Sequence, residues 1–170
     1  MPIDPELDAA LAAAKEFTPD LVERWSHAVD VEMVAALEAL DLNAMPVRKR
    51  IRTAVLTRLA ILKPHKQTAR RAALYLASPL QMPLALRLVA ATADAMWRAA
   101  HDTSTDFNWY TKRTILAAVY TATEIAWFGD DTPDESATAR FLDARIENVI
   151  QYEKLKTRVR AACQPIRTQS

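Results

Sequence analysis

Two apolar stretches set the fold class: PLALRLVAATADAMWRAA at residues 83–100 and FNWYTKRTILAAVYTATEIAWF at residues 107–128. The first is apolar or small on nearly every side, so we expect it to be a central helix. The second carries Leu116, Tyr120 and Trp127 at helical spacing and is expected to pack against it. No stretch shows the period-two alternation of a strand. Together these patterns predict an all-α protein.

Helix starts are marked by a repeated order of capping residue, proline and acid. The cap oxygen accepts from an unpaired N–H, proline at N1 loses no donor, and the acid favours the positive end of the helix dipole. Thr132 and Glu135 have the spacing of a capping box. We predict a single domain of about six to eight helices, at 5–16, 19–40 (one helix or two), 46–63, 65–77, 83–100, 107–128 and 133–162.

Composition excludes several classes of protein. With 170 residues, of which 51% are hydrophobic and 25% charged, the chain is long and apolar enough to bury a core. The single glycine, Gly129, argues against phosphate-cradling loops, and the single cysteine, Cys163, excludes an internal disulfide. Residues 80–100, the best candidate for a membrane span, are interrupted by charged residues. No secretory or mitochondrial leader is visible, so we expect a cytoplasmic protein.

Basic residues are concentrated in one part of the chain, because no acidic residue lies between Asp41 and Asp94. One interpretation is that the stretch forms a face that binds an anionic membrane, an acidic protein or nucleic acid. The alternative is that these are ordinary helix faces, whose charge is neutralised in the fold by acids from elsewhere in the chain. The end of the last predicted helix is also basic and fits either a surface-seeking amphipathic helix or ordinary cations at a helix C-terminus. The basic residues of the two regions are Arg48, Lys49, Arg50, Arg52, Arg58, Lys63, Lys66, Arg70, Arg71 and Arg87, then Lys154, Lys156, Arg158 and Arg160.

The sequence offers little for catalysis. His27, His65 and His101 lie far apart without metal-ligand spacing, and no Glu-x-x-His pair of a di-iron bundle is present. A Cys–His pair or a glycine-framed nucleophile is equally unsupported. We therefore expect that the protein is not an enzyme and binds no metal. The alternative hypothesis of an enzyme depends only on the grouping of His101, Asp102 and Asp106.

Residues 101–113, HDTSTDFNWYTKR, are unlike generic helix sequence. Thr103 and Asp106 fit a capping box, and three aromatic residues follow within the first turn. Adjacent helix positions point in different directions, so either at least one ring faces outward as a contact residue or all three wedge against neighbouring helices.

The run DTSTDFNWYTKR, followed by LAAVY at 116–120 and Thr123-Glu124, resembles the signature of the ubiquinone-biosynthesis lipid-binding family, the ninth Coq protein. The resemblance covers roughly residues 47–149. It extends to Asp94-x-x-Trp97 upstream and to Phe141-Leu142 with Arg145 downstream. It implies a TetR-like fold that binds lipid instead of DNA, with a diverged helix-turn-helix section at 1–45, a lipid-binding domain at 46–162 and a frayed tail at 163–170.

The resemblance also implies a function and the residues that carry it out. An isoprenoid quinone precursor, whose buried CH₂ groups contribute about 0.8 kcal/mol each, would be presented to a di-iron hydroxylase. The expected lipid pocket lies between 83–100 and 107–128, the partner patch follows the family alignment, and the basic residues would meet an anionic membrane. These sets are Leu86, Val89, Ala93, Trp97, Leu116, Tyr120 and Trp127 for lipid; Leu59, Met96, Asp106, Trp109 and Tyr110 for the partner; and Arg48, Arg52, Lys154 and Arg158 for the membrane.

Further expectations complete this interpretation. Bound lipid is the only cofactor, the chain forms a homodimer, binds no nucleic acid and associates peripherally with the inner membrane. The family's Gly-Trp pair near its start is missing, and His101 stands where the family has glycine, which should alter the turn there. The alternative is a TetR-like transcriptional regulator, suggested by the helical architecture and the basic stretch at 48–71.

Overall fold

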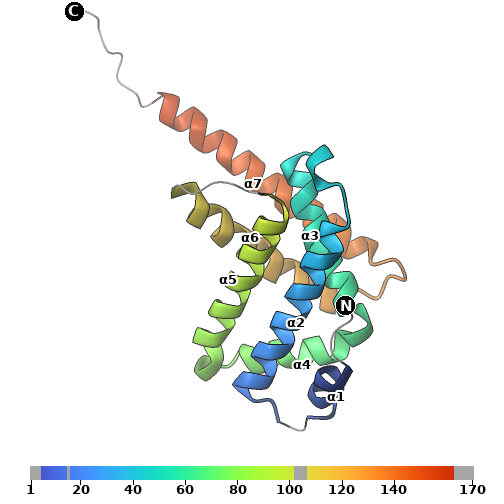
Figure 1. Ribbon diagram of the computed structural model, residues 1–170. Coiled ribbons are helices and arrows are strands. Elements are labelled where there is room, and N and C mark those ends of the chain that lie inside the picture. The colour runs from blue at the N-terminus through green and yellow to red at the C-terminus, as the bar shows by residue number, and fades with distance from the viewer. Residues whose placement is uncertain (1–4, 15, 102–106, 163–170) are drawn as a thin grey trace, which may run out of the picture.

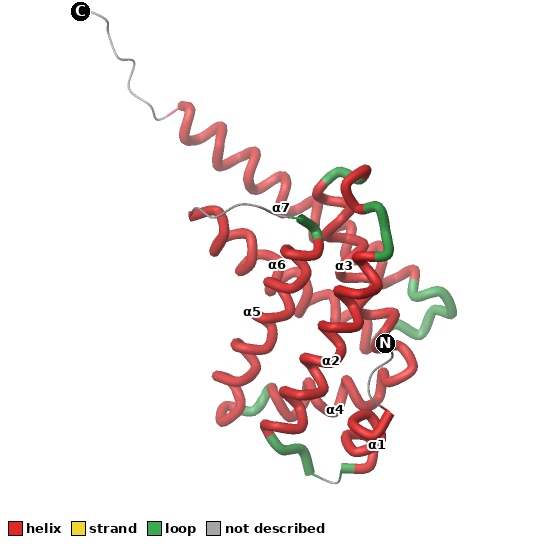
Figure 2. Tube along the Cα trace, in the orientation of Figure 1, coloured by secondary structure: helices red, strands yellow, loops and turns green. Residues whose placement is uncertain are grey.

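The protein is all-α, as predicted. The computed structural model describes residues 5–14, 16–101 and 107–162, and within them it has seven α-helices, three short 3₁₀-helices and no strand (Figures 1 and 2). The elements are α1 (Pro5–Ala13), α2 (Pro19–Glu38), η1 (Leu42–Ala44), α3 (Val47–Leu62), η2 (Lys63–His65), α4 (Lys66–Leu76), η3 (Pro79–Gln81), α5 (Met82–Ala99), α6 (Phe107–Phe128) and α7 (Ser136–Ala162).

One hydrophobic core joins these helices. α5 packs against both α2 and α6, α2 packs against α3, and α7 packs against α6. The buried apolar cluster runs from Leu7 in α1 to Leu142 in α7 and crosses the predicted boundary at residue 45 without a break. In Figure 1 the last turns of α7 extend beyond the bundle at its upper end, while α1 and α4 lie at the lower end. The part of the chain that the structure describes therefore has a single core.

The start of α2 confirms the capping rule. The Thr18 hydroxyl oxygen accepts from the Leu21 N–H at 3.3 Å, and Pro19 occupies the first helical position. The residues that α2 buries recur every three or four positions, which places them on one face toward the core. They are Val22, Trp25, Val29, Met33 and Leu37.

The start of α7 differs from the prediction, because the helix begins at Ser136 and not at Pro133. Thr132 does not cap it; its hydroxyl donates to Asp130 Oδ1 at 2.6 Å. Asp130 Oδ2 accepts instead from the backbone N–H and the hydroxyl of Thr138. Glu135 adopts a positive φ of 53° before the helix. The predicted capping box is wrong because a carboxylate upstream of it provides the acceptor for the first turn.

α5 is central over only its second half. Ala93 and Met96 are fully buried there, whereas Leu86 in the first half is 61% exposed. Leu86 and Met82, one turn apart, both face solvent. The expectation of an all-round buried helix is therefore wrong for its N-terminal half.

Candidate functional site

Most of the predicted lipid-pocket residues lie in the interior. The structure brings them to the α5–α6 layer, where Val89 is half-buried and the others are buried, apart from one. That exception is Leu86, which lies on the surface and does not line the interior. The buried members are Ala93, Trp97, Leu116, Tyr120 and Trp127.

An aromatic N–H in this layer has no hydrogen-bond partner. The indole N–H of Trp97 is buried without an acceptor among the described residues, and the same holds for Trp25 on α2. By contrast, Trp127 Nε1 donates to Glu135 Oε1 at 2.8 Å. A buried donor without an acceptor is costly, so Trp97 marks a position where a ligand oxygen would be stabilising.

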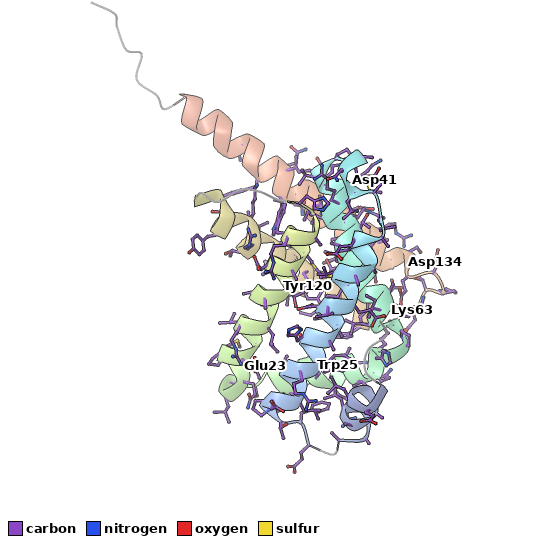
Figure 3. The ribbon with its side chains drawn as sticks, in the orientation of Figure 1. Glu23, Trp25, Asp41, Lys63, Tyr120 and Asp134 are labelled. Carbon is purple, nitrogen blue, oxygen red and sulfur yellow. The ribbon has the colours of Figure 1, made fainter. Side chains whose placement is uncertain are left out.

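A buried polar network crosses the middle of the bundle, around Arg58 on α3. Its Nε donates to Asp30 Oδ1 on α2 at 2.8 Å, and its Nη1 donates to the Tyr120 hydroxyl on α6 at 2.5 Å. Tyr120 in turn donates to Glu124 Oε1, and the Thr92 hydroxyl on α5 donates to Asp30. Four helices are thereby tied to one guanidinium, close to where Figure 3 labels Tyr120.

Burial and charge act against each other in this network. Burial disfavours the Arg58 charge, but the Tyr120 oxygen, Asp30 and Glu124 outweigh it and raise the arginine pKa. Burial raises the pKa of Tyr120 well above its ordinary value, although Arg58 opposes this. The pKa of Glu124 is also raised, by burial first, against the opposing effects of Arg58 and the Tyr120 hydrogen bond.

The predicted pocket residue Tyr120 is thus held on its polar side by the network. Its ring can line an apolar layer while its hydroxyl is occupied by Arg58 and Glu124. This network could not be predicted from the sequence, where Arg58 is one cation of the basic stretch and its partner Asp30 lies 28 residues away. The only local signal was an arginine in register with the buried residues Val55 and Leu62 of α3.

The junction of α5 and α6 is rich in charges and aromatic rings. Asp94 accepts a hydrogen bond from Arg113 Nε at 2.6 Å and forms an ion pair with Arg98, whose Nε lies 3.1 Å from Asp94 Oδ2. The Lys112 ammonium lies 5.5 Å from the centre of the Trp97 ring. The Asp-x-x-Trp pair therefore holds the start of α6 against the end of α5.

Of the five predicted partner residues, the structure places one on the surface. Tyr110 is 69% exposed near the start of α6. Leu59 and Met96 are 2% and 0% exposed, so they are core residues and not part of a surface patch. Asp106, together with the predicted Thr103 capping box, lies outside the described residues, as does the side chain of Trp109.

His101 ends α5 in the left-handed region, with a φ of 56°. Its backbone N–H donates to the Arg98 carbonyl, and its Nδ1 lies 2.8 Å from Asn43 Oδ1. A glycine adopts this conformation without steric cost. The turn is therefore of the glycine type although histidine occupies it, and the contact with Asn43 helps to hold it.

Acids elsewhere in the chain neutralise part of the basic stretch. Arg52 pairs with Asp143 at 2.6 Å, Lys63 with Glu135 and Arg87 with Glu23. Arg48, in contrast, is exposed at the start of α3. The side chains of Lys154 and Arg158 lie outside the described residues. Neutralisation within the fold therefore accounts for part of the charge asymmetry, and among the described residues Arg48 and Arg70 have no acidic partner.

A shallow open depression of about 610 Å³ lies at the α6–α7 turn, lined by Gly129, Pro133, Phe141 and neighbouring residues. It also holds Asp130, whose pKa is lowered by hydrogen bonds from Thr132 and Thr138. That carboxylate is used in starting α7. Among the described residues, no group of three histidine, cysteine or acidic side chains is placed to hold a metal ion.

Comparison with known proteins gives consistent relatives. The COQ9 family model matches residues 82–153, which span α5, α6 and the first part of α7. The chain is similar to the mitochondrial ubiquinone biosynthesis protein COQ9 of Rattus norvegicus, with 44% identity over 100 residues, covering 59% of this chain and 32% of the relative. The Homo sapiens protein of the same name is 43% identical over 100 residues, covering 59% and 31%.

A more distant relative matches more of the chain. The probable ubiquinone biosynthesis protein coq9 of Dictyostelium discoideum is 29% identical over 153 residues, covering 90% of this chain and 48% of the relative. The matches with the two mammalian proteins span about a third of their length. The family match contains the α5–α6 layer and its Asp94–Arg113 junction. Over residues 82–153 this chain is similar to the COQ9 family of ubiquinone biosynthesis proteins.

Proposed function

We propose that the chain acts in ubiquinone biosynthesis as a lipid-binding accessory protein, not an enzyme, which presents an isoprenoid quinone precursor to a di-iron hydroxylase at the membrane. The observation that carries the proposal is the α5–α6 layer within the family match. There Trp97, Leu116, Tyr120 and the small Ala93 belong to one buried apolar cluster, and the Trp97 N–H has no acceptor among the described residues. An isoprenoid chain suits such a cluster, and a quinone oxygen suits such a donor.

The polar residues of this region support an accessory role. Asp94 is engaged with Arg113 and Arg98, and Tyr120 with Arg58 and Glu124. Each of these groups therefore has a structural partner that positions a helix. Delivery of a lipid requires shape and apolar surface, and the hydroxylase would supply the chemistry.

A transcriptional regulator is not favoured. The relatives compared above are named for ubiquinone biosynthesis. Arg52, Arg58 and Lys63, in the stretch that suggested DNA binding, pair with acids of this chain. Phosphate contacts need open cations, and these three pairs leave fewer of them for the backbone of DNA.

Reconstitution with the hydroxylase, a quinone precursor and vesicles tests the proposal. We expect the chain to raise the hydroxylation rate, and Tyr110→Lys to lower both that rate and hydroxylase binding. Tyr152→Lys is the matched control, because Tyr152 is 62% exposed on another helix. Helical circular dichroism should be unchanged in both variants. An equal hydroxylation rate with and without the chain would refute the proposal. Equal losses in the Tyr110→Lys and Tyr152→Lys variants would refute the position of the partner surface.

A further inference from the structure

The turn from α4 to α5 carries a continuous apolar surface. We call residues 74–86 the α4–α5 corner, and every residue of the corner that is classed as exposed is apolar. Leu80 is 84% exposed, which makes it the most exposed of the large hydrophobic residues described. The exposed set is Leu74, Ala77, Pro79, Leu80, Met82, Pro83 and Leu86.

The geometry of the corner turns these side chains outward. The helical segments on either side of Ala77 and Ser78 meet at an angle of 91°. Met82 and Leu86 are one turn apart and share a face of α5, and Leu80 precedes them on η3. The exposed apolar side chains therefore lie at a sharp bend of the backbone.

The charges around the corner fit an anionic surface. Arg70 is exposed on α4 without an acidic partner in the described part of the chain. Within the described part of the chain, Arg71 donates to the carbonyl oxygens of Ala12 and Ala14 and lies 4.9 Å from the centre of the Phe17 ring, so no acid there neutralises its charge. Arg87 pairs with Glu23. Apolar side chains bordered by uncompensated arginines are typical of a segment that enters the interface of an anionic bilayer.

Length and composition limit how deep the segment can go. None of the described helices is by itself long and apolar enough to cross a membrane. The single bent pair with sufficient apolar character is centred on this corner. A sharply bent pair with exposed apolar side chains at the bend suits shallow insertion into the headgroup region.

We propose that the α4–α5 corner docks onto an anionic phospholipid surface, inserting Leu80 and Leu86 while Arg70 contacts lipid phosphates and Arg71 adds positive charge nearby. The inference refines the membrane association within the proposed function. The corner lies at the lower end of the bundle in Figure 1, at the opposite end from the start of α6 and the free end of α7. α5 rises about 1.5 Å per residue, so docking at its first turn leaves the other end of α5 about 25 Å away, and the start of α6 lies at that end in Figure 1.

Vesicle flotation tests the docking surface. The full chain is mixed with phosphatidylcholine vesicles, with and without phosphatidylglycerol. Leu80→Glu/Leu86→Glu should lower binding to anionic vesicles at least about tenfold. Val31→Glu/Ile125→Glu is the matched control, because Val31 and Ile125 are 55% and 65% exposed outside the corner. It should keep the binding of the unmodified protein, and Arg70→Glu should weaken binding only when phosphatidylglycerol is present.

Two outcomes overturn the docking proposal. Unchanged flotation of the corner variant would place the contact elsewhere, for example on α7. A corner variant that floats normally but no longer binds the hydroxylase would assign the surface to a protein. An environment-sensitive dye on Leu80→Cys, in a Cys163→Ser background, should shift to the blue on vesicles, and a dye on Val31→Cys should not.

The lipid content of the purified proteins separates this proposal from the proposed function. If the purified protein carries no lipid but still floats, and the corner variant does not float, the docking proposal stands and the lipid pocket is refuted. Lipid-filled protein that does not float would retain the pocket and refute the docking surface.

Discussion

Replacing Arg58 by leucine should be among the most damaging single changes in the core. Its side chain is 6% exposed and that of Asp30 is 13% exposed, with 2.8 Å between Arg58 Nε and Asp30 Oδ1. Removing one partner of a buried ion pair leaves the other charge uncompensated and costs about 3–5 kcal/mol. The total stability of a domain is about 5–15 kcal/mol. Arg58→Leu should therefore remove a large share of the free energy of unfolding.

A control on the same helix separates this effect from loss of an ordinary ion pair. Arg52 and Asp143 are joined at a shorter 2.6 Å, but their side chains are 38% and 51% exposed. Solvent screening limits an exposed pair to about 1 kcal/mol or less, so Arg52→Leu should have a small effect. Distance alone would rank the two pairs in the opposite order.

The assay is urea unfolding followed by circular dichroism and tryptophan fluorescence, with Asp30→Leu and the double variant Arg58→Leu/Asp30→Leu included. Replacing both charges should recover part of the loss, with a coupling energy of about 0.5–3 kcal/mol. If Arg58→Leu costs no more than Arg52→Leu, or if the effects at 30 and 58 simply add, the network does not hold the four helices together as described.

Three further variants test local chemistry. Because burial raises the pKa of Glu124, its contribution to stability is complete below its unfolded pKa and declines as pH rises through the folded value. In urea unfolding at several pH values, Glu124→Gln should lack this decline of the free energy of unfolding. The same pH dependence in the variant and the parent would contradict the assignment to Glu124. Hydrogen bonds from Thr132 and Thr138 lower the pKa of Asp130, so Asp130→Asn should be less stable than the parent near neutrality. That difference should close as the solution is acidified; a constant difference would exclude the carboxylate charge as its source. His101→Gly relieves a positive φ that costs about 1–2 kcal/mol and should unfold at higher urea than His101→Ala; equal midpoints would show that the turn is unstrained.

Local signals predicted the helices well. The bounds of α6 coincide with the predicted 107–128, because an apolar period and aromatic residues define both ends. Thr18 and Pro19 predicted the start of α2, because the capping hydroxyl and the N–H that donates to it lie within one turn. Where the interacting residues are close in sequence, the sequence pattern is enough to predict the local structure.

Long-range partners were outside the reach of the sequence. Arg58 looks like any other cation of the basic stretch until α2 brings Asp30 beside it. The start of α7 was misplaced because Asp130 reaches eight residues ahead to Thr138. Leu86 was assigned to the interior on hydrophobicity alone, although the corner before it leaves that face of α5 uncovered.

The site was predicted in part. The sequence assigned Trp97, Leu116 and Tyr120 to one layer, and the structure buries all three. It could not separate the surface residue Tyr110 from the core residue Met96, because alignment to a family pattern does not give exposure.

The central claim is that the α5–α6 layer holds lipid, and the most direct test is mass spectrometry of an organic extract from the purified chain, beside a mock purification. The account predicts isoprenoid quinones or their precursors enriched to a near-stoichiometric amount. A well-folded sample whose extract matches the mock would contradict it.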